Sequence, residues 1–319
     1  REAMFFEKLD GQKVRCGLCP RRCTIMPDRS GYCGVRKNEN VTLYTLIYGK
    51  ASSINVDPIE KKPLFHFHPG STCLSLGTLG CNMRCVHCQN WEIAHVVLVE
   101  GLHEQKVYNL LTEDRTELIS PEKAVEMALE SGAEGIAWTY NEPTIWFEYT
   151  LDSAKLAKAN GLYTVYVTNG YITPEALDTI GPYLYCWRVD IKGFSDDLYK
   201  NLARIPHWRD ILDVAKRAQE KWSMHVEVVT NIIPTMNDDD EQLTGIARWI
   251  HDELGELTPW HVTRFYPHHQ LMHLPPTPVA TLERACDIGQ KAGLKFVYTG
   301  NVPGHSHENT VCYNCGNLI

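Results

Sequence analysis

Three cysteines with the spacing C-x3-C-x2-C stand in the segment 80–91, where they are Cys81, Cys85 and Cys88. The segment directly follows an apolar run at 72–76 that has the composition of a β-strand. Three thiolates on one tight loop can hold three irons of a [4Fe–4S] cluster. Because such a cluster normally takes four cysteine ligands, one iron would remain open to bind and activate another molecule.

Two further groups of cysteines lie near the ends of the chain. The first consists of Cys16, Cys19, Cys23 and Cys33, and the second is a C-x2-C pair formed by Cys312 and Cys315. We expect a second metal site here, either zinc or an auxiliary iron–sulfur cluster. The terminal pair could complete a four-cysteine set with part of the first group, and the pairing is left open. The alternative is a set of buried, reduced thiols.

The composition of the chain is that of an ordinary globular protein. Its 319 residues are 44% hydrophobic and 22% charged, with a net charge of −8. This negative charge argues against a nucleic-acid binder that works by neutralising phosphates. An uninterrupted apolar run long enough to cross a membrane and a signal-peptide core are both absent from the sequence, so we expect a cytoplasmic protein without membrane contact. Twelve tightly grouped cysteines favour metal binding over disulfides in that compartment.

From residue 71 onward, short apolar segments alternate with amphipathic ones, which predicts repeated βα units. We expect strands at 71–77, 135–140, 163–168, 187–191, 225–231, 261–265 and 295–299. We expect helices at 121–131, 145–160, 208–221, 240–254 and 278–292. Repeated βα units form a parallel sheet with right-handed crossovers, so we predict an α/β fold with an open or closed barrel. Its chemistry would lie at the carboxyl ends of the strands.

Three parts of the chain follow from this pattern. They are a cysteine-rich N-terminal extension at 1–70, the core barrel at 71–275, and a C-terminal helix, strand and cysteine tail at 276–319 that pack on the core. The alternation of Phe65 and Phe67 with His66 and His68 predicts a half-buried strand before the barrel. Residues 96–119 break the alternation and are interpreted as an insertion or lid.

Polar residues follow the predicted strands at the positions where a barrel would place its site. They are Asn141, Glu142, Asn169, Asp190, Lys192 and Asn231. Each has a structural alternative: Glu142 could cap the next helix, and Asp190 and Lys192 could form a simple ion pair. Their recurrence at successive strand ends, opposite the cysteine loop, favours a common site.

The C-x3-C-x2-C motif after the first strand resembles the signature of the radical S-adenosylmethionine (SAM) superfamily, whose fold is a partial (β/α)6 barrel. A closer resemblance covers nearly the whole chain. Its motifs are CGLCPRRC at 16–23, CVHCQNW at 85–91, TYNEPT at 139–144, VTNGY at 167–171, DIKGF at 190–194 and YTGNVPG at 298–304. These motifs are similar to those of the radical SAM enzymes of the AmmeMemoRadiSam system, which are relatives of the pyruvate formate-lyase activating enzyme. That family implies Memo-like and Amme-type proteins as partners.

The resemblance also implies roles for individual residues. Cys81, Cys85 and Cys88 would bind the cluster, and His87 would meet the adenine of SAM. Asn141 and Glu142 would contact the SAM amino group. The remaining strand-end residues would lie around SAM: Asn169, Asp190, Lys192 and Asn231. Val167 stands where activating enzymes commonly have an acidic residue, which puts a bound monovalent cation in doubt.

The activity implied by this resemblance is reductive cleavage of SAM to a 5′-deoxyadenosyl radical, which takes hydrogen from a C–H bond of an unidentified substrate. An electron donor such as flavodoxin or ferredoxin would be needed. Two alternatives remain open. The protein could be an activase that installs a glycyl radical on a protein partner, or a zinc or iron–sulfur scaffold without enzymatic activity.

Overall fold

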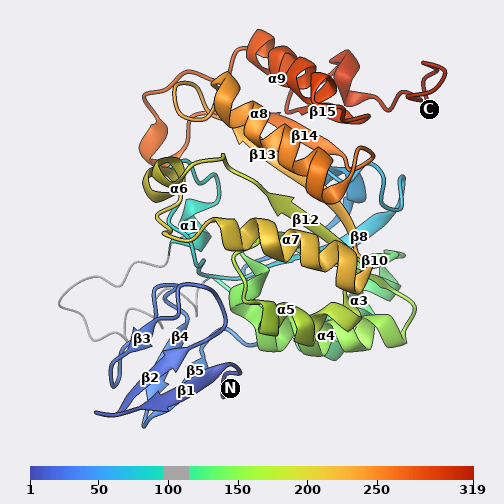
Figure 1. The fold of residues 1–319 in the computed structure, drawn as a ribbon. Helices are drawn as coiled ribbons and strands as arrows, with labels where there is room; N and C mark the ends of the chain where they lie inside the picture. Colours follow the sequence, from blue (N-terminus) through green and yellow to red (C-terminus); the bar gives the residue numbers. More distant parts are fainter. Residues whose placement is uncertain (96–114) are drawn as a thin grey trace.

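A curved, mostly parallel β-sheet forms the centre of the protein (Figure 1). The computed structural model describes residues 1–95 and 115–319. The strand order is β15-β14-β13-β12-β11-β10-β8-β7; every neighbouring pair from β8 to β15 is parallel, and β7 runs antiparallel to β8. The strands are β7 (Ser53–Pro58), β8 (Thr72–Gly77), β10 (Gly135–Trp138), β11 (Tyr163–Thr168), β12 (Cys186–Asp190), β13 (His225–Ile232), β14 (Trp260–Arg264) and β15 (Val297–Gly300).

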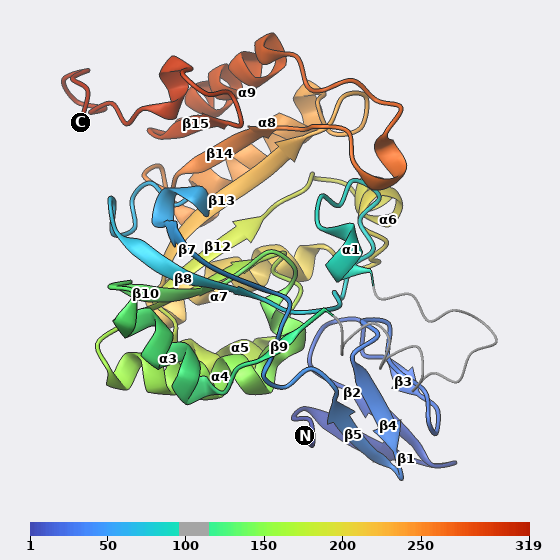
Figure 2. The same ribbon diagram turned by 180° about the vertical axis from the view of Figure 1, so that it is seen from behind.

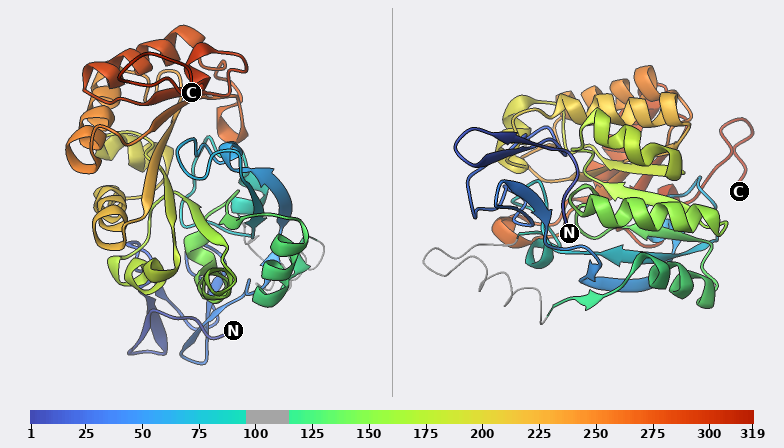
Figure 3. Two further views of the ribbon diagram at one scale, coloured as in Figure 1. Left: turned by 90° about the vertical axis from the view of Figure 1, so that its right-hand side faces the viewer. Right: turned by 90° about the horizontal axis from the view of Figure 1, so that it is seen from below.

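The helices surround the sheet on its outer side (Figure 3). The longer ones are α3 (Pro121–Glu130), α4 (Phe147–Ala159), α7 (Arg209–Trp222), α8 (Asp240–Trp249) and α9 (Val279–Lys291). The predicted α/β partial barrel, with its strands and long helices, is thereby confirmed. Three short helices were not predicted from the sequence: α1 (Trp91–Ala94), α5 (Pro174–Ile180) and α6 (Asp196–Leu202). Helices this short carry too few residues for a clear periodicity.

Local sequence signals mark the helix ends. Ser120 caps α3, because its side chain accepts a hydrogen bond from the Lys123 amide at 3.2 Å, and Pro121 takes the first helical position. In the same way Ser195 caps α6 by accepting from the Leu198 amide. Among the described residues, no helix is long and apolar enough to cross a membrane.

The first 45 residues form a small separate sheet region, which we call the N-terminal module. It contains a three-stranded sheet and a hairpin, and it lies beside the barrel below the ends of the central strands (Figure 2). Its strands are β1 (Phe6–Leu9), β2 (Lys13–Cys16), β3 (Thr24–Ile25), β4 (Arg36–Glu39) and β5 (Thr42–Thr45). A further short pair, β6 (Lys50–Ala51) and β9 (Glu117–Leu118), follows the module. The C-terminal tail lies at the opposite end of the molecule.

A buried ion pair fastens the N-terminal module to the barrel. Arg36 of β4 and Glu148 of α4 are 3.1 Å apart, and each side chain is only 2% exposed. Glu148 also accepts a hydrogen bond from the Met4 amide at 2.7 Å. Desolvating two charges is costly, so the pair is retained only because each partner compensates the other.

The predicted strand at Phe65–His68 is wrong, because these residues form a loop under the amino-terminal ends of β13 and β14. The backbone amides of Phe65 and His66 donate to the Glu227 carboxylate at 3.2 and 2.9 Å rather than to the backbone of a neighbouring strand. Glu227 is fully buried and also accepts from His225 at 2.9 Å and His261 at 2.6 Å. This carboxylate therefore organises the closed end of the barrel.

Glu227 makes the stability of the fold dependent on pH. Burial opposes its charged form, but the hydrogen bonds from His225 and His261 prevail and lower the pKa of Glu227 to about 2. A lowered folded-state pKa gives stability that is present above the unfolded-state pKa and is lost as the pH falls through the folded-state value. Between about pH 4.5 and pH 2, we expect the free energy of unfolding of the wild type to fall by on the order of 2–3 kcal/mol more than that of Glu227→Gln. Denaturant unfolding of both proteins across this pH range measures the difference. If the free energies of unfolding of the two proteins changed in parallel with pH, the role given to ionised Glu227 would be contradicted.

The ion pair between the module and the barrel predicts a large stability effect. Glu148→Gln leaves the Arg36 guanidinium buried without its counter-charge, which should lower the free energy of unfolding by about 3–5 kcal/mol. Glu7→Gln is the matched control, because it breaks the exposed pair with Arg15, whose side chains are 46% and 58% exposed. That change should cost less than about 1 kcal/mol. Equal midpoints for the two variants in urea unfolding would disprove the role of Glu148.

Candidate active site

The three cysteines of the C-x3-C-x2-C motif lie on the segment 78–90, which we call the cluster loop, at the carboxyl end of β8. One side of the loop follows the end of α6: the amides of Arg84 and Val86 donate to the carbonyls of Ala203 and Leu202 at 3.1 and 3.0 Å. The other side meets the N-terminal module, where the Arg84 guanidinium donates to the Tyr32 carbonyl at 2.7 Å. The loop is therefore held from two sides.

Gly80 allows the cluster loop to approach the N-terminal module closely. Its φ is +91°, and a Cβ atom added there would lie 2.8 Å from both the Cys33 carbonyl oxygen and Val35 Cγ1. Both the positive φ and the lack of space exclude a larger residue. The glycine directly before Cys81 thus fixes where the first cysteine of the motif stands.

Two of the predicted asparagines hold the cluster loop. Asn141 accepts from the Thr78 amide at 3.0 Å and donates to the Gly80 carbonyl at 2.7 Å. Asn169 donates to Asn82 Oδ1 at 2.9 Å and lies 3.6 Å from Cys81 Sγ. Asparagine can serve as donor and acceptor together, which suits it to bridging backbone groups of a loop.

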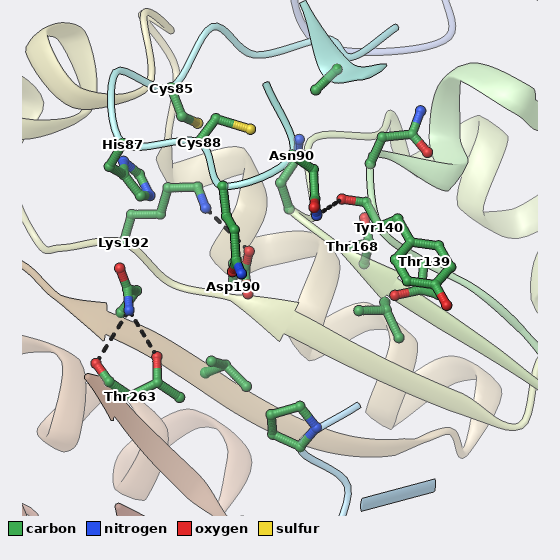
Figure 4. A pocket seen from close by; sticks show the side chains of 18 of the residues that line it. Cys85, His87, Cys88, Asn90, Thr139, Tyr140, Thr168, Asp190, Lys192 and Thr263 are labelled. Atoms are coloured by element: carbon green, nitrogen blue, oxygen red, sulfur yellow. Dashed lines mark hydrogen bonds and ion pairs between the residues drawn. The ribbon is translucent and has the colours of Figure 1, made fainter. Parts of the chain in front are cut away.

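The structure brings all ten residues predicted for the main site to one pocket of about 590 Å³ at the carboxyl ends of the strands. Figure 4 shows Cys85 and Cys88 on one side of this pocket, with His87 and Lys192 beside them and Asp190 next to the Lys192 amine. The ten residues are Cys81, Cys85, His87, Cys88, Asn141, Glu142, Asn169, Asp190, Lys192 and Asn231.

Glu142 is buried in the pocket wall, and its carboxylate accepts three hydrogen bonds. It accepts from the Thr144 amide at 2.9 Å, the Thr168 hydroxyl at 2.7 Å and the Asn169 amide at 2.8 Å. Burial nevertheless raises the pKa of Glu142, because it outweighs these stabilising hydrogen bonds. Its bond to the Thr144 amide caps the 3-10 helix η2 (Pro143–Trp146), so the capping role considered from the sequence is present.

Asp190, the last residue of β12, is flanked by two cations: Arg188 from the same strand and Lys192 from the segment that follows it. Arg188 donates to one of its oxygens, and Lys192 Nζ lies 3.1 Å from the other. Burial opposes ionisation, but Arg188 and Lys192 together lower the pKa of Asp190. Burial also opposes the charge on Lys192, whose pKa is raised by Asp190 and by the nearby Cys85. The three side chains form a charged group in which cations exceed carboxylates.

His87 and Asn231 complete the predicted set. Burial, assisted by the charge of Lys192, lowers the pKa of His87 to about 3, so the imidazole is neutral. Its Nδ1 is buried, with no hydrogen-bond partner among the residues that the structure describes. Asn231 donates to the Thr263 hydroxyl at 3.1 Å.

Several residues in and around the pocket were not predicted from the sequence. Arg188 could have been found, because it stands two residues before Asp190 on the same strand, and alternate residues of a strand share a face. Lys62 and its partner Asp57, 2.7 Å apart, come from the antiparallel edge and the loop beyond it, where no motif marks them. Arg264 is the last residue of β14 and also lines the pocket.

The cysteines predicted for a second site are in two separate places. Cys16, Cys19, Cys23 and Cys33 line a small cavity in the N-terminal module. Cys312 and Cys315 lie in the C-terminal tail at the other end of the molecule (Figure 1). Within residues 1–95 and 115–319, no three His, Cys, Asp or Glu side chains are already gathered closely enough to hold a single metal ion.

The main pocket fits a cluster and a small organic cofactor in its donors and its size. Three thiols on one loop suit an iron–sulfur cluster with one open iron. The volume of about 590 Å³ lies within the usual range for small-molecule sites, ~300–1,000 Å³. The unpartnered Nδ1 of His87 is a polar atom that a ligand in the pocket could satisfy.

The close approach at Gly80 can be tested through iron incorporation. In Gly80→Ala the new methyl group would push the loop away from Cys33, so we expect a clear drop in iron bound after anaerobic reconstitution. Gly132→Ala is the control, because Gly132 also has a positive φ, +71°, but has no atom within 4 Å of an added Cβ. It should share the backbone strain of about 1 kcal/mol and keep its iron. Equal iron contents in the two variants would refute this role of Gly80.

Comparison with known proteins places the chain in a family. It is 43% identical over 319 residues to the uncharacterized protein MJ0808 of Methanocaldococcus jannaschii, covering 100% of this chain and 90% of that protein. It is 23% identical over 234 residues to the pyruvate formate-lyase 1-activating enzyme of Escherichia coli, covering 69% of this chain and 89% of that enzyme. The solved structure of SuiB from Streptococcus suis bound to S-adenosylmethionine shares the fold, with a TM-score of 0.52 and 13% identity over 71% of this chain and 51% of that chain. Residues 76–249 match the Radical SAM superfamily, and the protein belongs to that superfamily.

Proposed function

We propose that the protein cleaves SAM reductively at a [4Fe–4S] cluster bound by Cys81, Cys85 and Cys88, and uses the cleavage to abstract hydrogen from a substrate. The observation that carries this proposal is the convergence of all ten predicted residues on one pocket at the strand ends. When bound, the cluster supplies one electron that breaks the S–C5′ bond of SAM, and the 5′-deoxyadenosyl radical takes the hydrogen atom.

In this proposal the strand-end residues divide into two groups. Asn141 and Glu142 hold the pocket wall, because their polar atoms already engage the cluster loop and the Thr168–Asn169 turn. Their contact with the SAM amino group remains part of the proposal. Asn169 stands between the two groups, since it contacts Cys81 and faces the pocket.

The other group would meet SAM itself. His87 presents a neutral, buried imidazole beside the last cysteine, which suits contact with an uncharged adenine. Arg188 and Lys192 give the pocket cationic character next to Asp190, which suits a ligand with a carboxylate. Asn231 offers an amide from the next strand.

The finer assignment is that of a radical SAM enzyme of the AmmeMemoRadiSam type, with Memo-like and Amme-type proteins as partners. Its support is the set of motifs that run from the N-terminal cysteines to the YTGNVPG segment. An electron donor such as flavodoxin or ferredoxin is required by the reductive step. Cytoplasmic location belongs to the same proposal.

Activation of a protein partner is the second candidate function. It is favoured by the relatives that are named pyruvate formate-lyase activating enzyme and isethionate sulfite-lyase activating enzyme, the latter 24% identical over 167 residues. In this case the hydrogen would come from a glycine of a partner chain rather than from a small molecule.

Production of 5′-deoxyadenosine tests the proposed function. The reconstituted protein, reduced with dithionite and supplied with SAM under anaerobic conditions, should release 5′-deoxyadenosine and methionine. Cys85→Ala should reduce this release to the background of SAM alone. The control is Cys286→Ala, because Cys286 is fully buried in α9 and does not line the pocket.

The outcomes separate the candidates. Equal turnover by wild type and Cys85→Ala would overturn the assignment of the cluster loop. A wild-type protein that binds iron but releases no 5′-deoxyadenosine would favour the scaffold alternative.

A further inference from the structure

The four cysteines of the N-terminal module come together through its turns. Cys16 ends β2, and its amide donates to the Cys23 carbonyl at 3.0 Å, which brings both ends of the turn side by side. Within the turn, the Arg22 amide donates to the Cys19 carbonyl at 3.0 Å. Cys33 stands just before β4, and all four cysteines line the same cavity. A C-x2-C turn between paired strands is a common arrangement in structural zinc sites.

The size of this cavity distinguishes a single ion from a cluster. Its volume is about 20 Å³. A water molecule needs ~10–15 Å³ on the same kind of measure, so there is room for one atom-sized body. A [4Fe–4S] cubane of eight atoms would require the module to expand. Since four thiolates in tetrahedral geometry are the usual ligands of structural zinc, the cavity favours one Zn²⁺.

The surroundings provide for the charge of such a site. Four thiolates around Zn²⁺ carry a net charge of −2, and both Arg21 and Arg36 line the cavity. Arg36 is 1% exposed, and its Nε is a buried donor with no hydrogen-bond partner in the described part of the chain. A negatively charged thiolate nearby would compensate this otherwise costly donor.

The module also contacts the cluster loop directly beside this cavity. Arg21 donates to the Asn82 carbonyl at 3.4 Å and to the Arg204 carbonyl at 2.7 Å. Asn82 lines the cavity and follows Cys81 in the loop. On the other side, the Cys33 carbonyl is the group that excludes a side chain at position 80. Any shift of Cys33 or of the Cys19–Cys23 turn would therefore be transmitted to the cluster loop.

We propose that Cys16, Cys19, Cys23 and Cys33 bind one zinc ion, which fixes the N-terminal module against the cluster loop. The four Sγ atoms are not yet gathered around a single point, so binding draws them inward by side-chain rotation. Cys312 and Cys315 take no part, because they lie in the tail at the far end of the molecule. Metal binding of this kind contributes directly to folding stability.

Metal analysis of the full-length protein, purified and reconstituted anaerobically, tests the proposal. Wild type should contain about one zinc and about four irons per chain. Cys19→Ser should lose the zinc, and its iron content should fall as well, because the loop loses its brace. The double variant Cys312→Ser/Cys315→Ser is the matched control and should keep both metals. Cys85→Ala should lose iron and keep zinc, which separates this site from the main one.

Wild-type protein provides a second measurement should Cys19→Ser fail to fold. Growth with Co²⁺ in place of zinc should give the strong visible bands of a tetrahedral thiolate site, in an amount of about one cobalt per chain. Retention of zinc by Cys19→Ser would overturn the proposal. So would about eight irons without zinc in wild type, which would indicate an auxiliary cluster, or the absence of both zinc and cobalt. These results do not depend on SAM cleavage.

Discussion

A loop that turns three cysteines toward a pocket cannot satisfy its own backbone hydrogen bonds, and much of the surrounding structure supplies them. Asn141 takes one amide and one carbonyl of the cluster loop, and residues 202–203 take two further amides. The Arg84 guanidinium donates to two carbonyls of the cluster loop itself, those of Cys81 and Met83, and to the Tyr32 carbonyl of the N-terminal module. Unpaired buried backbone groups are costly, so these partners determine the loop conformation.

Charge in the pocket follows from the same geometry. The parallel strands end side by side, so the residues that follow them are forced into proximity whatever their sign. Glu142 accepts hydrogen bonds from neutral donors, whereas Asp190 forms ion pairs with Arg188 and Lys192. As a result, the pKa of one buried carboxyl is raised and that of the other is lowered. The pocket thus has a cationic character near Lys192, where two cations face one carboxylate.

The parts that the sequence predicted correctly depend on local or periodic signals. Apolar strand runs such as 163–168 depend on neighbours in sequence, and parallel topology then brings the strand ends together. The missed features depend on contacts between distant segments. Phe65–His68 alternates like a strand, but its amides find the Glu227 carboxylate, some 160 residues away in sequence.

The same reasoning applies to the site. Lys62 reaches the pocket, paired with Asp57, only because β7 pairs with β8, and no motif in that segment predicts this pairing. Gly80 could be recognised as a turn residue, but its lack of a side chain is required by Cys33, which lies in a turn of the N-terminal module. The C-terminal cysteines had suitable spacing, yet the C-terminal strand β15 at the sheet edge leads the tail away from the N-terminal module.

The N-terminal module is best regarded as a support of the cluster loop rather than an appendage. A segment of 45 residues is too short to build an independent core of ordinary stability. Its buried side chains, such as Val14, Ile25 and Val35, belong to the same hydrophobic cluster as the barrel. The barrel strands hold one another through their own ladder, whereas the cluster loop takes part of its support from the module. Weaker contacts between the module and the barrel would therefore displace the three cysteines of the cluster loop before they disturbed the central strands.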